Sequence, residues 1–174
     1  LHGWFGTNHN RVWRTTNGGE SWSSAPTGST SSYGVAFRDA STGYAIHENG
    51  YVARTTDGGQ SWGPVGSPTS ETISAVSAVP GSASAWFTTS TASYRTRNDG
   101  SAWVSETLFP FVGGLTHLSF ADTGTGWVVT SNGEVLKYSS GTPTGVSAPT
   151  PSTLPWSVVL DQNYPNPFNG SARI

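Results

Sequence analysis

Short stretches in which apolar and polar residues alternate, separated by turns rich in Gly, Asn and Asp, run through most of the chain. Alternation with a period of two is typical of β-strands whose faces differ in burial. Four such stretches follow one another at 33–38, 44–47, 51–55 and 61–65. Turns separate them at 39–43, at Asn49-Gly50 and at 57–59. Because both positions of an Asn-Gly pair tolerate positive φ, this segment predicts antiparallel strands joined by tight hairpins.

The same pattern returns about every 41 residues. Trp22, Trp62 and Trp103 are spaced 40 and 41 residues apart, and each closes a similar phrase: RTTNGGESW, RTTDGGQSW and RTRNDGSAW. A second phrase precedes it in GWFG, GYAI, AWFT and GWVV, and a third in VAFRDASTG and LSFADTGTG. A repeat of four short strands per 40-odd residues is typical of a β-propeller blade.

The repeat predicts an all-β chain containing a partial β-propeller of about 3.5–4 four-stranded antiparallel blades over residues 1–140. We place strands 2 to 4 of one blade at 3–24, fuller blades at 33–65 and 73–106, and a fourth at 116–140. A single blade cannot bury both of its faces, so neighbouring blades must cover it. Fewer than six blades do not close the usual ring, so we expect an open arc with an apolar blade face exposed at the N-terminal end.

Composition supports strands and weakens several classes of function. The chain has 22 Gly, 8 Trp, no Cys and no Met, and only 10% of its residues are charged, compared with about 25% in a typical domain. The net charge of −2 without a basic stripe argues against nucleic-acid binding. No apolar run approaches the roughly 20 residues of a transmembrane segment. The four His residues lack metal-ligand spacing, so we expect no metal and no cofactor.

The Trp-containing phrase resembles the Asp-box, or BNR repeat, with the pattern Ser/Thr-x-Asp-x-Gly-x-Ser/Thr-Trp. One copy matches at every fixed position, a second has Asn for Asp, and a third has Asn for Asp and Ala102 for the hydroxyl. The matching residues are Thr55, Asp57, Gly59, Ser61 and Trp62, then Thr15, Asn17, Gly19, Ser21 and Trp22, then Thr96, Asn98, Gly100 and Trp103. Since Asp and Asn side chains accept hydrogen bonds from nearby backbone N–H groups, we interpret these boxes as structural.

The whole repeat is similar to propellers related to the photosystem II assembly factor, while sialidases, sortilin-type receptors and xyloglucan-cleaving glycosidases share the Asp-box. The resemblance implies a fold, but one fold hosts many functions. In families with the motif, the boxes lie on the face opposite the ligand site.

The C-terminal part of the chain has a different character. Residues 141–155 are rich in Pro, Ser and Thr and predict a linker. Residues 156–174 resemble the start of the type A C-terminal sorting domain of type IX secretion, a small β-sandwich, and depart from that family at Gly170. The matching residues are Leu160, Asp161, Gln162, Asn163, Tyr164, Pro165, Asn166, Pro167, Phe168 and Asn169. The resemblance implies that type IX secretion machinery exports the parent protein, which is then secreted or attached to the outer-membrane surface.

Few acids are left for catalysis once the repeat is taken into account. Asp39 and Asp122 occupy the same place in the third phrase, so we interpret them as turn residues. Arg14, Arg54, Arg95 and Lys137 also share one repeat position, which favours a structural or solvated row. A glycosidase needs two carboxyl groups across its substrate, so the catalytic pair of a sialidase- or xyloglucanase-like enzyme would have to lie in other blades.

We therefore favour a non-enzymatic module that binds a protein or glycan, and keep the glycoside hydrolase as the alternative. An assembly factor for a membrane complex is a third hypothesis, against which the sorting segment argues. The loops between second and third strands and between blades share one face of a propeller. On that face His47 and Glu48 are the most chemically capable pair, and Phe109 and Phe111 form the most apolar insertion.

Overall fold

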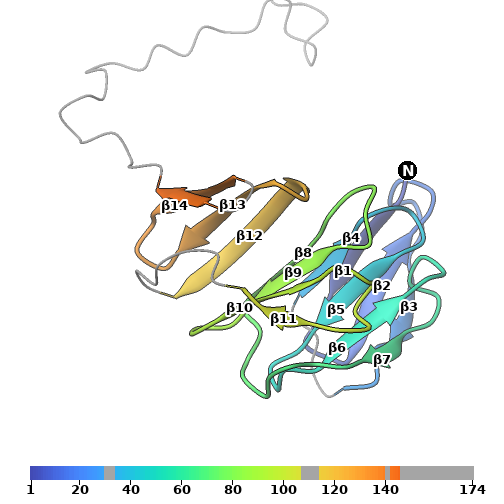
Figure 1. The fold of residues 1–174 in the computed structure, drawn as a ribbon. Coiled ribbons are helices and arrows are strands. Elements are labelled where there is room, and N and C mark those ends of the chain that lie inside the picture. The colour runs from blue at the N-terminus through green and yellow to red at the C-terminus, as the bar shows by residue number, and fades with distance from the viewer. Residues whose placement is uncertain (30–33, 107–113, 140–141, 146–174) are drawn as a thin grey trace, which may run out of the picture.

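The computed structural model describes residues 1–29, 34–106, 114–139 and 142–145. These residues form four antiparallel sheets and no helix (Figure 1). The first sheet contains β1 (Gly3–Gly6), β2 (Arg11–Thr15) and β3 (Ser23–Pro26). The second contains β4 (Gly34–Phe37), β5 (Gly43–Ile46), β6 (Val52–Thr55) and β7 (Gly63–Val65). The third contains β8 (Ala75–Ala78), β9 (Ala85–Thr88), β10 (Ser93–Thr96) and β11 (Val104–Ser105). The fourth contains β12 (Leu115–Asp122), β13 (Thr125–Thr130), β14 (Val135–Ser139) and β15 (Thr142–Gly145).

Each sheet is a simple meander in which strands adjacent in sequence pair. The first strands of the second, third and fourth sheets, β4, β8 and β12, lie next to one another and form the inner edge of the arc. The sheets follow one another without closing a ring (Figure 1). The predicted all-β class and the open series of antiparallel blades are confirmed, including the absence of a first strand from the blade at 3–24.

The two ends of a sheet carry different connections because neighbouring strands run in opposite directions. The turns at Asp39–Thr42 and Asp57–Gly59 lie at one end, which we call the turn face. The loops at His47–Gly50 and Ser131–Gly133 lie at the other end, which we call the loop face.

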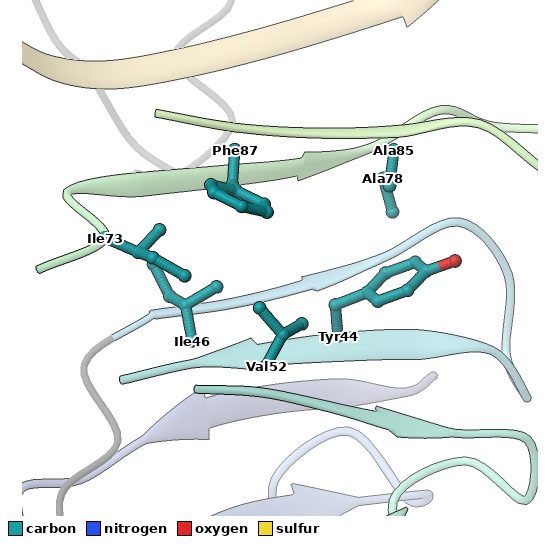
Figure 2. Close-up of a cluster of buried hydrophobic side chains, with 7 residues drawn as sticks. All are labelled: Tyr44, Ile46, Val52, Ile73, Ala78, Ala85 and Phe87. Carbon is teal, nitrogen blue, oxygen red and sulfur yellow. The ribbon is translucent and has the colours of Figure 1, made fainter. Parts of the chain in front are cut away.

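A buried apolar layer fills each space between neighbouring sheets. Between the first and second sheets it contains Val12, Ala45 and Ala53. Between the second and third it contains Tyr44, Ile46, Val52, Ile73, Ala78, Ala85 and Phe87, as Figure 2 shows. Between the third and fourth it contains Val79, Trp86, Leu115, Phe120, Val128 and Tyr138. The second and third blades are therefore covered on both faces and the two end blades on one, as the stacking of repeats in an open series requires.

The F-x-D-x-x-x-G phrase has a steric explanation. Phe37 pairs across strands with Gly43, and a Cβ added to that glycine would lie 2.6 Å from the Phe37 ring. Phe120 and Gly126 repeat this arrangement, also at 2.6 Å. The third sheet has Ala78 opposite Ala85 instead. The glycine is therefore needed where the phenylalanine ring lies flat over its strand partner.

The aromatic residue after this glycine, or after Ala85 in the third sheet, joins neighbouring sheets. Trp4 stacks on Phe37 with ring centroids 3.8 Å apart, and Trp86 stacks on Phe120 at 5.0 Å. Tyr44 meets the small Ala78 in the same layer. Two of the three interfaces are therefore filled by stacked rings and one by a ring packed near a small residue, which fills the space between the sheets.

Both end sheets leave large apolar side chains exposed. Phe5 and Trp22 in the first sheet are 45% and 41% exposed, as expected for an open N-terminal blade face. Trp127 and Val135 in the fourth sheet are 40% and 43% exposed.

The last blade extends further along the chain than the sequence indicated. β15 pairs with β14 and carries the fourth sheet to Gly145, inside the segment expected to be a linker. Its Pro143 lies on an edge strand, where a residue without an N–H group is tolerated. The rest of that linker and the sorting-motif residues, from Leu160 to Asn169, lie outside the described residues.

Candidate functional site

The turn after β6 is held together by its own side chains. Thr55 Oγ1 accepts hydrogen bonds from the backbone N–H of Asp57 at 3.3 Å and of Gly59 at 2.9 Å. Asp57 Oδ1 accepts from the backbone N–H of Gln60 and of Ser61, both at 2.9 Å, and Ser61 Oγ donates to Oδ2 at 2.6 Å. Burial opposes ionisation of the carboxyl, but the bonds from Ser61, Thr55 and Gln60 outweigh it and lower the pKa of Asp57 to about 2. The Asp57 carboxylate therefore stabilises the turn through these hydrogen bonds.

The two related turns share this bonding. Gly19 N donates to Thr15 Oγ1 and Gly100 N donates to Thr96 Oγ1, both at 2.9 Å. The amide oxygen of Asn17 accepts from Ser21 N at 3.1 Å, and that of Asn98 accepts from Ala102 N at 2.9 Å. The side-chain oxygen common to Asp and Asn makes the bond, which explains why either residue serves. Membership of these turns in the Asp-box family stays a prediction.

The tryptophans that close the three phrases do not share one environment. Trp22 is 41% exposed and donates to Gly19 O at 3.2 Å. Trp62 is half-buried and meets Phe37 edge-on at 5.9 Å. Trp103 is half-buried between Tyr44 and Phe87, with ring centroids at 6.2 and 4.7 Å. The latter two tryptophans are packing residues, whereas Trp22 is left partly uncovered at the end of the arc.

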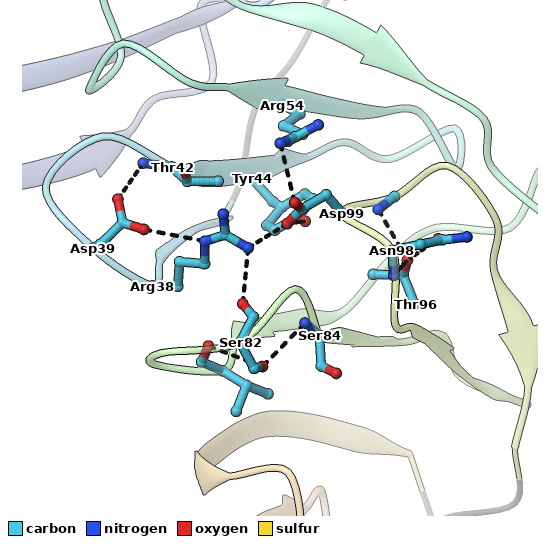
Figure 3. Close-up of polar contacts among 12 residues, drawn as sticks. Arg38, Asp39, Thr42, Tyr44, Arg54, Ser82, Ser84, Thr96, Asn98 and Asp99 are labelled. Atoms are coloured by element: carbon cyan, nitrogen blue, oxygen red, sulfur yellow. Dashed lines mark hydrogen bonds and ion pairs between the residues drawn. The ribbon is translucent and has the colours of Figure 1, made fainter.

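Asp99 joins the second and third sheets on the turn face (Figure 3). Its carboxylate accepts a close hydrogen bond from Arg38 Nη1 and lies 3.4 Å from Arg54 Nη2. Arg38 Nη1 also donates to Ser82 O at 2.8 Å. Two cations from the second sheet thus bind one anion from the third, which orients the two blades.

Most acidic residues of the described chain are engaged in such contacts. Asp39 Oδ1 accepts from Ser41 Oγ at 2.7 Å, from Thr42 N at 2.7 Å and from Ser41 N at 2.8 Å. Burial opposes ionisation, but these bonds outweigh it and lower the pKa of Asp39 to about 2. Asp122 Oδ1 accepts from Gly124 N at 2.7 Å. Both aspartates therefore hold turns between first and second strands, as their shared place in the repeat indicated.

His47 and Glu48, two of the residues expected on the ligand face, differ in their exposure. His47 is fully buried, and burial lowers the pKa of its imidazole to about 4. Its ring meets Tyr51 edge-on at 5.0 Å, and among the described residues neither ring nitrogen has a hydrogen-bond partner. The adjacent Glu48 is exposed. The histidine of the predicted pair therefore packs inside the blade, and a role of His47 and Glu48 in binding stays a prediction. Phe109 and Phe111 lie outside the described residues.

A hollow that the sequence did not reveal opens at the inner edge of the arc, towards the loop face. It has a volume of about 220 Å³ and is lined by Gly34 and Ile46, by residues 74–76 and by residues 116–118. We call it the inner-strand hollow. Ser74 and His117 are exposed there, and Thr116 is half-buried and donates to Val129 O at 3.0 Å. No Asp, Glu, Lys or Arg side chain is among the residues that line the hollow.

The hollow also borders free strand edges. β4, β8 and β12 are each the terminal strand of their sheet, so one edge of each carries backbone groups that no strand of the same sheet pairs. One such group, the N–H of Phe120, donates to Ser77 Oγ in the neighbouring sheet at 3.0 Å. An extended ligand at this edge would meet backbone donors and acceptors as well as the side chains of Ser74 and His117.

Within the described ranges, no group of three or more His, Asp and Glu side chains is placed to hold a metal ion. No helix able to cross a membrane occurs in the same ranges.

Comparison with solved structures identifies the class of fold. YCF48 from Cyanidioschyzon merolae matches with a TM-score of 0.63 at 24% identity, over 85% of this chain and 53% of that chain. YCF48 bound to D1 peptide matches with a TM-score of 0.57 at 19% identity, over 66% of this chain and 38% of that chain. A streptogramin B lyase matches with a TM-score of 0.62 at 19% identity, over 77% and 46%. The chain has the fold of a partial β-propeller.

This chain spans about half or less of the length of these three proteins. No protein-family model matches the chain, and no curated protein sequence matches it significantly. At sequence identities of 19 to 24%, the similarity to these structures shows a shared fold.

Proposed function

We propose that this chain is part of a β-propeller module that binds an extended segment of a partner protein at the inner-strand hollow. The observation that carries the proposal is the meeting of three successive blades at one uncharged concavity, where Ser74 and His117 are exposed beside free strand edges. Free edges bind extended peptides through backbone hydrogen bonds, and nearby side chains select the sequence. The similarity to a YCF48 structure that contains a peptide supports a polypeptide ligand.

The contacts of four aspartates support binding rather than hydrolysis as the role of this part of the chain. Asp39, Asp57 and Asp122 are held by their own turns, and Asp99 is paired with two arginines. Each of these carboxylates already has a structural role, and none of them lines the inner-strand hollow.

Selection from a displayed random-peptide library against the full chain tests the proposal, with affinities then measured by fluorescence anisotropy. Ser74→Trp fills the hollow and is expected to weaken a selected peptide at least 10-fold. Ser101→Trp places the same indole at an exposed serine on the turn face and is expected to leave the affinity unchanged. Equal affinities for the two variants, or selection of glycans but no peptide from matched libraries, would contradict the proposal.

We also propose that type IX secretion exports the parent protein, either into the medium or to the outer-membrane surface. The similarity of residues 160–169 to the sorting domain supports this route. In a bacterium with this machinery, Tyr164→Ala with Phe168→Ala is expected to hold the protein inside the cell envelope. Thr150→Ala with Ser152→Ala is the matched control. Continued export of the first double variant would refute the route.

A further inference from the structure

An arginine lies at the end of the third strand of each of the first three blades, and its surroundings differ from blade to blade. Arg54 is paired with Asp99 of the next sheet at 3.4 Å. Arg95 lies 3.9 Å from Glu106, over the Trp86 ring at 4.9 Å, and donates to Thr123 O at 3.3 Å. Arg14 occupies the same position in the first sheet, and among the described residues it forms neither an ion pair nor a hydrogen bond. Arg14 thus lacks the anion that Arg54 and Arg95 have. Among the described residues Lys137, at the same position of the fourth sheet, forms no ion pair either.

The missing partner can be located from the repeat. Asp99 follows Asn98 in the third turn, and the residue that follows Asp57 in the second turn is Gly58. A Cβ added to Gly58 would lie 4.0 Å from Arg14 Nη1, which is where a side chain equivalent to Asp99 would begin. The same Cβ would lie 2.8 Å from Ala40 O. The backbone at Ala40 therefore leaves no room for an acid supplied by this position of the chain.

Space for an anion exists instead in front of the guanidinium. A hollow of about 260 Å³ is lined by Arg14, by residues 23–25 and by Gly59 and Gln60 from the next sheet. Ser23 is the cross-strand partner of Arg14 and is exposed, whereas Arg54 has Gly63 as its partner in β7. The Gln60 amide uses one N–H for Asp57 O at 2.9 Å and has a second to donate. A cation, a hydroxyl and an amide N–H thus converge on one opening.

We infer that this Arg14 hollow binds the carboxylate of an aspartate or glutamate side chain from a partner polypeptide. The ligand group takes the place that Asp99 fills beside Arg54, and Ser23 replaces the glycine of the second blade with a donor. A guanidinium binds a carboxylate through two parallel hydrogen bonds, and partial burial strengthens such a pair. The site lies on the turn face, away from the inner-strand hollow, and so does not depend on the function proposed there.

Titration of the full chain with N-acetyl-aspartate N-methylamide, followed through the Nε–Hε NMR signals of the arginines, tests the inference. A saturable shift of the Arg14 signal is expected, and the neutral probe N-acetyl-asparagine N-methylamide is expected to bind at least 10-fold more weakly. Arg14→Gln should remove the difference between the two probes. Arg11→Gln should preserve it, because Arg11 lies on the opposite face of β2 and donates to Ser24 Oγ at 2.8 Å.

Three results would overturn the inference. The acidic and neutral probes could shift the Arg14 signal equally, which would remove the role of charge. The acidic probe could bind Arg14→Gln as tightly as the wild type, which would place the site elsewhere. Glucuronate could bind at Arg14 more tightly than the aspartate probe, which would make the ligand an acidic glycan.

Discussion

The contact between Phe37 and Gly43 gives a quantitative test of how the blades are built. A methyl group at position 43 would lie 2.6 to 2.7 Å from three atoms of the Phe37 ring, about 1 Å closer than carbon atoms normally approach. The ring cannot easily move away, because it stacks on Trp4 of the neighbouring sheet at 3.8 Å. Overpacking of this kind costs about 1–3 kcal/mol. We expect Gly43→Ala to lower the free energy of unfolding by roughly 2 kcal/mol.

A double-mutant cycle separates this clash from other effects of the substitution. Phe37→Ala removes the ring and is also destabilising, by about 2 kcal/mol or more, since it opens a cavity next to Trp4. The double variant reproduces the Ala78–Ala85 pair that the third sheet has at these positions. We expect it to be at least about 1 kcal/mol more stable than the sum of the single changes predicts, since residues in contact are coupled.

Urea unfolding followed by tryptophan fluorescence measures all four stabilities. Gly63→Ala is the matched control, because a Cβ there meets no atom within 4 Å, and it is expected to change stability by less than about 0.5 kcal/mol. Additive effects of the two substitutions, or a Gly43→Ala variant as stable as Gly63→Ala, would refute the steric explanation of the phrase.

Three further predictions concern buried and charged groups. Asp99→Asn removes the anion shared by Arg38 and Arg54 and should lower the free energy of unfolding by about 1 kcal/mol, because the pair is partly exposed; equal urea midpoints would contradict this. His47 is neutral when folded, so stability should fall as pH drops from about 6.5 to about 4, where only the unfolded chain binds the proton; His47→Gln should remove that dependence in urea titrations across this range. The lowered pKa of Asp57 contributes stability above pH 3.8 that is lost as pH falls towards 2, and Asp57→Asn should reduce this acid sensitivity while retaining the turn, as Asn17 does.

The repeat made much of the fold predictable from sequence. Four strands between residues 33 and 65 follow from local alternation and an Asn-Gly turn, and both features act over a few residues. The strand β15 was missed because Thr142–Gly145 has no alternation of its own. Its conformation comes from pairing with β14. Edge strands of this kind are set by tertiary context rather than by local propensity.

The sites were less accessible to sequence reasoning. His47 stands beside a hairpin turn, which suggested exposure, yet the side chain packs inside the second blade. The inner-strand hollow combines residues near 34, 75 and 117, and no local pattern links them. The Arg14 hollow had a signal in the sequence: the second turn phrase has Gly58 where the third has Asp99, while the arginine that precedes each turn is kept. A repeat that loses the acid facing an arginine while it keeps the arginine indicates an arginine without an ion-pair partner.

Photocrosslinking from the inner-strand hollow tests the central claim most directly. A benzoyl-phenylalanine in place of the exposed His117 is expected to crosslink to a selected peptide, and the same residue in place of the exposed Ser101 on the turn face is not. Crosslinks from position 117 that excess unlabelled peptide abolishes would support binding at the inner edge of the arc. Crosslinks from position 101 alone would contradict the account and place the peptide on the turn face.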